Sequence, residues 1–385
     1  MGQMTEKISE IKSCVTRLLD WYRRNARDLP WRRDITSYRV WVSEIMLQQT
    51  RVEAVRPYYE RFLKELPTIR DLAGADDRVL MKLWEGLGYY SRVRNMQKAA
   101  RDICERFGGQ MPGNYEDIRS LCGIGDYTAG AIASFAFGLP YPAVDGNVLR
   151  VMARLTGNGG DILNPSVRKQ LTAAVEDILP NEAPAEFNQA MIEIGATVCK
   201  PNGVAGGPVC KGCPFETACQ AHRMGRETEL PVRVVKTRRR EEDRTVFKLW
   251  SGDRCAVCRR PERGLLSGLY EFPNVKGHLS MEEALNTVRK MGFEPLQILP
   301  MARAEHVFSH LVWHLIGWSV RIGDVEPDET LPYQFFLQSD IKKRIPIPAA
   351  FAAYAGQNSW TDGTEPQERV MTGAGPADQQ NGKTK

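Results

Sequence analysis

The chain has 385 residues, which exceeds the length of a typical single domain and predicts two or three domains. Hydrophobic residues make up 42% and aromatic residues 9% of the sequence, and this content excludes global disorder. The formal net charge of +5 is a mild basic bias, compatible with a phosphate-binding surface but not enough to establish one.

Neither a leader nor a membrane segment is predicted. The N-terminal residues alternate charged and apolar side chains and lack the apolar core of a signal peptide. The longest apolar stretch, 129–144, contains Pro140 and Pro142 and is shorter than the ~18 residues that a membrane helix requires. We therefore expect an intracellular, cytoplasmic protein without membrane contact.

Residues 1–226 are predicted to be almost entirely helical. From Ile8 to Tyr22 apolar residues recur every three or four positions, which is typical of one amphipathic helix. Helices are also predicted at 40–47, at 80–84, at 167–179 after a capped start at Asn164-Pro165, and at 187–198 after Pro184.

Glu44 stands in one of these helices among large apolar neighbours, in the sequence WVSEIMLQQT (41–50). A carboxylate there is costly unless it is paired, or unless its pKa is raised so that it can act as an acid. The sequence leaves both interpretations open: a general acid, or a structural glutamate paired with Arg39 or Arg51.

A Gly-x-Gly turn, Gly123 to Gly125, separates two predicted helices. Such a turn exposes N–H groups at the start of the next helix and can bind a phosphate, although many helix–helix turns use glycine only for steric reasons. Asp145 follows twenty residues after Gly125 and opens another helix. Aspartate at that position is most simply an N-cap.

Four of the nine cysteines cluster with the spacing C-x10-C-x2-C-x5-C. In a reducing cytosol such a cluster indicates metal binding, and the spacing alone is compatible with zinc and with a [4Fe–4S] centre. Cys255 and Cys258 form a second C-x2-C in a strand-like run. Alternation would point them to opposite faces, so we interpret this pair as structural.

The chain changes character after Cys219. Residues 227–244 are charged, have no apolar period and are predicted to be a linker. Short β-type runs follow from Thr245, interrupted by one helix at 280–291, and predict an α+β domain of about 110 residues. The polar tail beyond residue 356 is predicted to be disordered.

Several of these segments resemble adenine DNA glycosylases of the MutY type. The resemblance runs in order over residues 8–350. It rests on LPWR (29–32), WVSEIMLQQTRV (41–52), WEGLGYYSRVRN (84–95), LCGIGDYTAGAIASFAF (121–137), VDGNVLRVMARL (144–155), FNQAMIEIGATVC (187–199), GLLSGLYEFP (264–273) and FSH (308–310).

The resemblance implies a multidomain chain. Its fold class is an all-α helix-hairpin-helix glycosylase, a six-helix barrel with an iron–sulfur cluster lobe, followed by an α+β nudix-like domain. The implied partner is double-stranded DNA with adenine opposite 8-oxoguanine or guanine, bound by a monomer. The expected limits are 30–137 for the barrel with its hairpin, 1–29 and 138–226 for the cluster domain, 227–244 for the linker, 245–356 for the nudix-like domain and 357–385 for the tail.

The resemblance also implies residue roles. Glu44 would protonate adenine at N7 and later serve as base for water, while Asp145 would stabilise or capture the sugar cation, with Tyr127 and Asn147 in support. The other implied sets are the adenine pocket (Arg27, Trp31, Gln189), the DNA contacts (Gln49, Thr50, Leu87, Tyr89, Gly123, Gly125), the ligands of one [4Fe–4S] cluster (Cys199, Cys210, Cys213, Cys219) and the 8-oxoguanine loop (Phe308, Ser309, His310).

Three departures from the family pattern stand out. Ten residues, rather than the usual six, separate the first two cysteines, which leaves the path of that loop open. Cys122 replaces a proline in the hairpin. The C-terminal domain lacks the acidic run of nudix hydrolases, since only Glu282 and Glu283 are adjacent, and this argues against nucleotide hydrolysis.

Three other functions compete with a monofunctional glycosylase. A bifunctional glycosylase/lyase is disfavoured because Tyr127 stands where related endonuclease III enzymes carry a Schiff-base lysine. A non-catalytic DNA-binding protein would not need both Glu44 and Asp145. A nudix pyrophosphatase lacks its metal-binding carboxylates.

Overall fold

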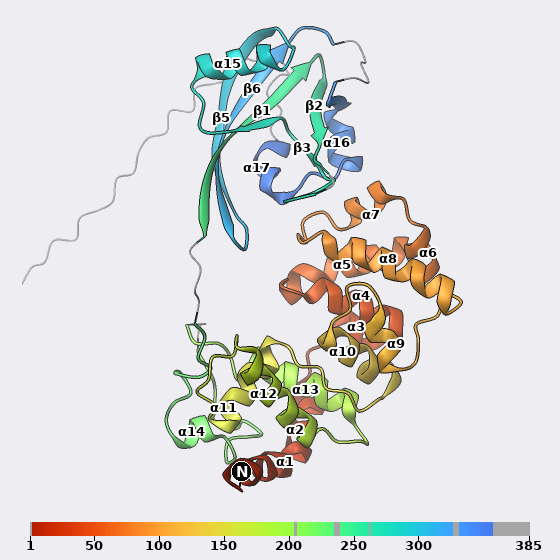
Figure 1. The fold of residues 1–385 in the computed structure, drawn as a ribbon, viewed down its shortest axis with the longest axis vertical. Coiled ribbons are helices and arrows are strands. Elements are labelled where there is room, and N and C mark those ends of the chain that lie inside the picture. The colour runs from red at the N-terminus through yellow and green to blue at the C-terminus, as the bar shows by residue number, and fades with distance from the viewer. Residues whose placement is uncertain (1, 204–205, 235–238, 262, 326–330, 357–385) are drawn as a thin grey trace, which may run out of the picture.

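The structure, a computed structural model, describes residues 2–203, 206–234, 239–261, 263–325 and 331–356. Figure 1 shows two helical lobes below a β-sheet domain, and helices α1 to α14 precede the first strand. The tail predicted at 357–385 lies outside the described residues. Every helix in the described part of the chain is too short or too polar to span a bilayer.

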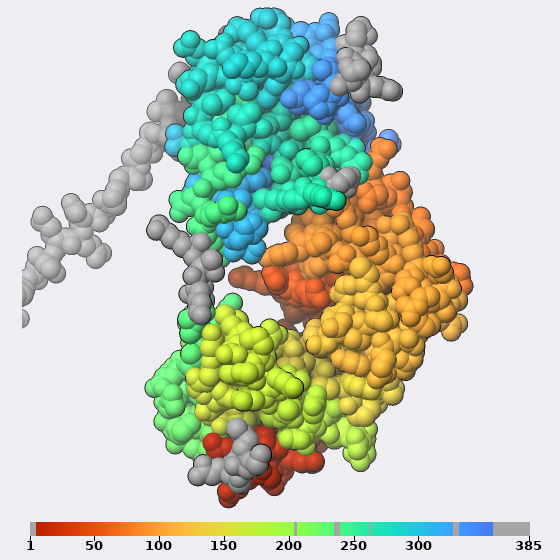
Figure 2. All heavy atoms as spheres, in the orientation of Figure 1, coloured from red at the N-terminus to blue at the C-terminus, as the bar shows by residue number. Residues whose placement is uncertain are grey.

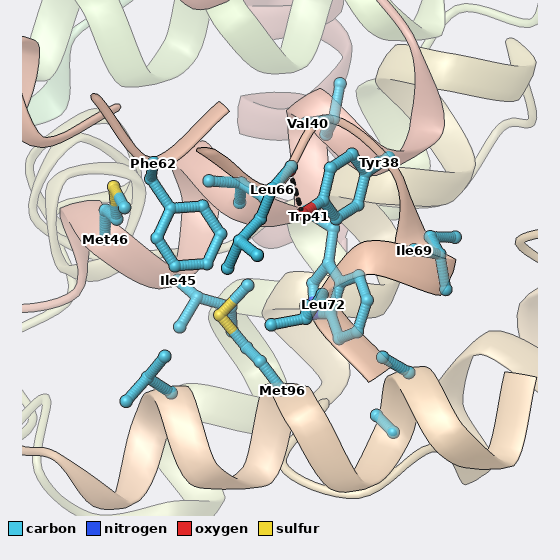
Figure 3. Close-up of a cluster of buried hydrophobic side chains, with 14 of the residues drawn as sticks. Tyr38, Val40, Trp41, Ile45, Met46, Phe62, Leu66, Ile69, Leu72 and Met96 are labelled. Carbon is cyan, nitrogen blue, oxygen red and sulfur yellow. Dashed lines mark hydrogen bonds between the residues drawn. The ribbon is translucent and has the colours of Figure 1, made fainter. Parts of the chain in front are cut away.

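The first helical lobe consists of helices α3 to α10. Trp41, Phe62 and Trp84 are fully buried in its core. Tyr38 is buried there too, and its hydroxyl is satisfied because it donates to the carbonyl of Leu66 at 2.8 Å (Figure 3). The helices are α3 (Pro30–Arg33), α4 (Ser37–Leu47), α5 (Val52–Glu65), α6 (Ile69–Gly74), α7 (Asp77–Leu83), α8 (Ser91–Arg106), α9 (Tyr115–Ser120) and α10 (Asp126–Phe137).

The second lobe combines the N-terminal helices with those that follow Asp145. The single helix predicted from Ile8 to Tyr22 is wrong, because the chain breaks at Cys14. The side chains of Ser13 and Cys14 donate to the carbonyl of Glu10 at 2.7 and 3.3 Å, which competes with the backbone ladder. The helices are α1 (Gly2–Ser13), α2 (Val15–Asn25), α11 (Gly146–Thr156), α12 (Pro165–Ile178), α13 (Pro184–Thr197) and α14 (Gln220–Arg223).

The C-terminal part contains one sheet with the order β3-β2-β1-β6-β5, and β4 and β7 pair with β1 and β2. Helix α15 covers one face, where Phe247 packs with Val288, and α16 and α17 cover the other, where Trp250 packs with Tyr354. The elements are β1 (Arg240–Ser251), β2 (Arg254–Arg259), β3 (Tyr270–Glu271), β4 (Asn274–Lys276), α15 (Met281–Lys290), β5 (Pro295–Val307), β6 (Leu311–Ile322), β7 (Tyr333–Leu337), α16 (Gln338–Arg344), the 3₁₀ helix η1 (Ala349–Phe351) and α17 (Ala352–Ala355).

The segment predicted as a linker, 227–244, is ordered at both ends. Leu230 is buried against the second lobe, and its carbonyl accepts from Arg154 Nε at 2.8 Å. At the other end β1 begins at Arg240, five residues before the predicted strand, because residues 240–244 pair in parallel with β6. Their charged side chains point mostly to solvent while the backbone is paired, so the charge pattern concealed the strand.

The sheet domain contacts the first lobe directly. Leu269 lies in the core of that lobe. The carboxylate of Glu85 accepts from the backbone N–H of Ile347 at 2.8 Å, and Lys82 Nζ donates to the carbonyl of Ile345 at 3.1 Å. Figure 2 shows a hollow between the two lobes and the sheet domain.

Candidate active site

A cleft of about 590 Å³ contains most of the predicted catalytic and pocket residues. The first lobe contributes α3, α4 and α10 to its wall. The second lobe contributes the start of α11 and part of α13. The predicted residues on its wall are Arg27, Trp31, Glu44, Gln49, Thr50, Tyr127, Asp145, Asn147 and Gln189. Leu87, Tyr89, the hairpin glycines, the cysteines and the FSH loop lie elsewhere.

Glu44 faces this cleft from a helix that is buried along almost its whole length. Only 6% of the residue is exposed, and the Tyr127 hydroxyl donates to its Oε2 at 2.5 Å. Arg39, a possible ion-pair partner in the sequence analysis, instead pairs with Asp34 at 2.5 Å. Among the described residues no cation lies within ion-pair distance of Glu44.

The protonation of Glu44 follows from this environment. Burial raises its pKa to about 7; the hydrogen bond from Tyr127 opposes the rise, and the negative charge of Asp145 adds to it. Burial also raises the pKa of Tyr127 well above its ordinary value, so the phenol stays protonated and acts as a donor. A substantial fraction of the Glu44 carboxyl groups therefore carries a proton near neutral pH.

Asp145 is the N-cap of α11, as the simplest interpretation of the sequence predicted. Its Oδ1 accepts from the N–H of Val148 at 2.8 Å, and its Oδ2 accepts from Asn147 Nδ2 at 2.6 Å. Arg150 holds Asn147 in turn by donating to its Oδ1 at 2.9 Å. Burial raises the pKa of Asp145, and these hydrogen bonds oppose the rise. Capping places the carboxylate on the wall of the cleft, so the two interpretations of Asp145 are compatible.

Arg27 and Gln189, two of the three predicted adenine-pocket residues, are held by hydrogen bonds, and Trp31 is held by ring packing. Arg27 Nε donates to Glu193 at 2.7 Å, and Arg32 Nη2 donates to the same carboxylate at 2.8 Å. The hydroxyl of Tyr22 donates to Gln189 Oε1 at 2.9 Å. Trp31 packs edge-on against Tyr59 at 5.5 Å.

Glu193 was missed by the sequence analysis. Its side chain is completely buried, and two arginines from a segment more than 160 residues away neutralise it and lower its pKa against the effect of burial. A glutamate inside the apolar run MIEIGA is the signal that could have revealed it. Because Arg27 lies on the cleft wall, Glu193 fixes one side of the pocket.

Of the two glycines in the hairpin between α9 and α10, only Gly123 has a backbone conformation that favours glycine. Gly123 has a φ of 78°, and a Cβ there would lie 2.7 Å from Asn95 Cβ. Gly125 is extended, with φ −94° and ψ 177°, and open space surrounds it. Gly125 is the N-cap of α10, and no described side chain caps this helix, so its first N–H groups remain available to a ligand.

The four clustered cysteines line a single small cavity in the second lobe. Their thiols are free, and apolar walls from α11 and α13 surround them. Arg154 Nη1 donates to the sulfur of Cys199 at 3.1 Å, which places a cation beside the thiol set. These features suit a polythiolate metal centre. The four are Cys199, Cys210, Cys213 and Cys219.

Backbone pairing accommodates the long spacing between the first two cysteines. Cys199 forms an antiparallel bridge with Pro208, and the N–H of Val209 donates to the carbonyl of Val198 at 3.0 Å. The pairing closes the intervening residues into a loop, of which 204–205 lie outside the described residues. Cys199 and Cys210 therefore line the same cavity although ten residues separate them in the sequence.

A second set of donor atoms lies beside the cysteines. Ligand atoms of Cys210, His222 and Glu227 lie within 4.8 Å of one another. His222 Nδ1 and Glu227 Oε1 are hydrogen-bonded to each other at 2.5 Å. Because these two groups already satisfy each other, the all-cysteine set fits a metal centre better.

The predicted lesion-recognition loop is the tight turn between β5 and β6. The N–H of Phe308 donates to the carbonyl of Leu311 at 2.7 Å, and the Phe308 ring packs on Trp313 at 4.9 Å. Ser309 and His310 are exposed, and their side chains are 3.2 Å apart. The long hairpin carries this turn toward the hollow between the lobes (Figures 1 and 2).

The acidic pair of the C-terminal domain is a helix-capping feature. Glu283 forms a capping box with Ser280, accepting from its N–H at 2.8 Å, at the start of α15. Glu282 lies in the same first turn.

Comparison with known proteins agrees with this architecture. Residues 42–177 match the HhH-GPD superfamily base excision DNA repair protein family, and residues 245–356 match the NUDIX domain. The solved structure of a thermostable thymine-DNA glycosylase is 25% identical, with a TM-score of 0.50 over 57% of this chain and 98% of that one. Fold and site thus define a helix-hairpin-helix DNA glycosylase of base excision repair joined to a nudix-like domain.

Curated relatives narrow the class to one activity. The adenine DNA glycosylase of Rattus norvegicus is 35% identical, with 84% of this chain and 74% of the relative aligned. That of Homo sapiens is 33% identical, over 84% of this chain and 70% of the relative. The chain belongs to the adenine DNA glycosylase family.

Proposed function

We propose that this enzyme removes adenine paired with 8-oxoguanine or guanine, using Glu44 as general acid and base and Asp145 to stabilise the sugar cation. The observation that carries the proposal is one cleft holding two carboxyl groups: the buried Glu44, with a pKa of about 7, and the partly exposed Asp145. A proton donor active at neutral pH requires such a pKa.

The proposed reaction breaks the bond between N9 of adenine and C1′ of deoxyribose. Glu44 gives its proton to N7, so adenine leaves with the electron pair of that bond as a neutral base. Asp145 faces the positive charge that develops at C1′, or captures it as a covalent adduct. Water then attacks C1′ and returns a proton to Glu44, and the net change is hydrolysis.

Tyr127 supports this reaction by donating to Glu44 Oε2, which leaves Oε1 to hold the transferable proton. A phenol cannot form an imine with the sugar aldehyde. We therefore propose that the enzyme is monofunctional and does not cut the strand.

Adenine excision is expected to fall as pH rises through about 7. The acid form of Glu44 is needed, and its fraction drops about tenfold per pH unit above its pKa of about 7. Single-turnover rates from pH 5.5 to 9 measure this. Tyr127→Phe removes the hydrogen bond that lowers this pKa, so its midpoint should lie at a higher pH. A rate that increases with pH through 7 would contradict the role of Glu44.

The base and the duplex would be held by separate sets of residues. Extruded adenine would occupy the cleft beside Arg27, Trp31 and Gln189. The remaining contacts would be made by two segments that enter the duplex and by the hairpin that binds a phosphate: Gln49 and Thr50, Leu87 and Tyr89, and Gly123 and Gly125.

The four cysteines would hold one [4Fe–4S] cluster, as is common in this superfamily, and the cluster would stabilise the fold of the second lobe. Purified protein is expected to be brown and to contain roughly four irons per chain. Cys213→Ser should lose the iron, whereas Cys258→Ser in the sheet domain should retain it. Anaerobically prepared protein that is colourless and contains about one zinc per chain would contradict this assignment.

The C-terminal domain would recognise the base opposite adenine through Phe308, Ser309 and His310. 8-Oxoguanine differs from guanine by an oxygen at C8 and a proton at N7, which the exposed polar groups of the β5–β6 turn can distinguish. A polar contact of this kind contributes ~1–3 kcal/mol of discrimination.

In the full chain, Ser309→Ala combined with His310→Ala should therefore reduce the preference for 8-oxoguanine over guanine by roughly tenfold. The assay compares excision rates in duplexes with adenine opposite 8-oxoguanine, guanine and thymine. His278→Ala, an exposed histidine of the same domain, is the matched control and should leave the preference unchanged. Equal losses on both mispairs would mean that the turn contributes affinity and not recognition.

A further inference from the structure

One arginine ties together two segments that are distant in sequence. Arg92 lies in the first turn of α8, and its two terminal nitrogens point to different segments. Nη1 donates to the end of α4, the helix that carries Glu44, and Nη2 donates to the segment just before α8. The acceptors are the carbonyls of Ile45 (2.7 Å), Met46 (3.2 Å) and Gln48 (2.6 Å) for Nη1, and of Leu87 (3.0 Å) and Gly88 (3.1 Å) for Nη2.

Both segments contain a residue in a strained backbone conformation. Gln49 has a φ of 58° and Tyr89 a φ of 47°, and Leu266 is the one other described non-glycine residue with a positive φ. Arg92 binds the carbonyl immediately before each strained residue, that of Gln48 and that of Gly88. Strained residues persist where their surroundings hold them, and here one guanidinium holds both.

The charge of Arg92 is directed to backbone and rings. Among the described residues no carboxylate lies within ion-pair distance of it, and its guanidinium packs over Trp84 at 5.3 Å and Tyr89 at 5.7 Å. The carbonyls at the end of α4 carry the negative end of the helix dipole and lack partners within the helix. A cation at this position caps α4 and orients the Tyr89 ring at once.

We propose that Arg92 is a positioning residue for base extrusion: it holds Gln49 and Tyr89 in the conformation that enters the duplex and fixes both to the helix of Glu44. The inference rests on the proposed function, which assigns these two residues to duplex contacts. A planar guanidinium reaches five carbonyls in two directions, whereas a lysine ammonium has three donors around one atom. Charge alone is therefore insufficient.

The test compares Arg92→Lys with the unchanged full chain. Arg61→Lys is the matched control, because Arg61 also packs over a ring, that of Tyr58 at 4.8 Å, and donates to one carbonyl, that of Leu83 at 3.3 Å. Hydrogen exchange without DNA should be faster at 45–50 and 86–90 together in Arg92→Lys, and unchanged there in Arg61→Lys. Unchanged exchange, or faster exchange in one segment alone, would overturn the proposal.

The second measurement separates extrusion from chemistry. Single-turnover excision is measured for adenine opposite 8-oxoguanine and for adenine opposite an abasic-site analogue, where no partner base holds it. Arg92→Lys should lose about tenfold or more on the paired adenine and several-fold less on the unpaired one, with the same pH midpoint on both. Equal losses would overturn the role in extrusion. If hydrogen exchange in both segments had nevertheless become faster, Arg92 would still hold the two segments together, and the assignment of Gln49 and Tyr89 to duplex contacts would be wrong.

Discussion

Glu44→Gln is expected to bind a duplex with adenine opposite 8-oxoguanine as tightly as the unchanged enzyme, and to excise adenine about 10²–10⁴ times more slowly. Glutamine fills the same buried space, and its amide oxygen can still accept from Tyr127. It has no proton to give to adenine. Single-turnover rates with saturating enzyme measure excision, and mobility shifts measure binding.

The same variant, which loses activity, is expected to gain thermal stability. The pKa of Glu44 in the folded protein, about 7, lies above the ordinary value of 4.5, so ionising this group opposes folding. Its contribution to stability is complete below about pH 4.5 and is lost as pH rises through about 7. The melting temperature of Glu44→Gln should therefore rise relative to the unchanged enzyme between pH 5 and 8. Near-normal turnover, or a parallel pH dependence of the two melting temperatures, would remove Glu44 from the mechanism.

Asp145→Asn is expected to slow excision by about 10²-fold or more and to lower the melting temperature less than Asp145→Ala does, because it keeps the helix cap and loses only the hydrogen bond from Asn147. Asparagine caps helices as well as aspartate does, so α11 keeps its start and the hydrogen bond from Val148. The negative charge that faces the sugar cation is lost, and preorganised electrostatic groups of this kind contribute about 10²–10³-fold. Single-turnover rates and thermal unfolding separate the two roles of the residue.

Two comparisons sharpen this test. Asp145→Ala removes cap and charge together and should lose about 1 kcal/mol of stability besides the activity. Asn147→Ala removes the donor to Asp145 Oδ2 and the acceptor of Arg150 Nη2 but keeps the negative charge, and should lose much less activity than Asp145→Asn. If Asp145→Asn excised adenine at the normal rate, Asp145 would be an N-cap and nothing more.

Local patterns were sufficient for much of the secondary structure. The Asn164-Pro165 start is present, with Asn164 Oδ1 accepting from the N–H of Ser166 at 2.9 Å. The helix predicted at 280–291 is α15, Met281–Lys290. Such signals lie within a few residues of one another, so no tertiary information is needed to read them. The family was also evident, because its motifs occur in order along the chain.

The same local patterns gave wrong predictions where the secondary structure depends on distant strand pairing or on competing side-chain hydrogen bonds. The charged residues 240–244 form a strand because β6 pairs with them, seventy residues further along. The N-terminal helix breaks at Cys14 because side chains take the carbonyl of Glu10. Apolar periodicity indicates which side chains face a core, but it contains no information about the hydrogen-bond partners of the backbone.

By itself the sequence determined the class of enzyme, the candidate carboxyl groups and the four-cysteine cluster, since residue identity and order carry that information. Only the tertiary structure decided the state of Glu44, which depends on burial and on Tyr127, 83 residues away. It also revealed the buried Glu193 and the two-sided clamp of Arg92. Desolvation and hydrogen bonding depend on distance in space, so groups remote in sequence set the chemistry of residues that the sequence can only nominate.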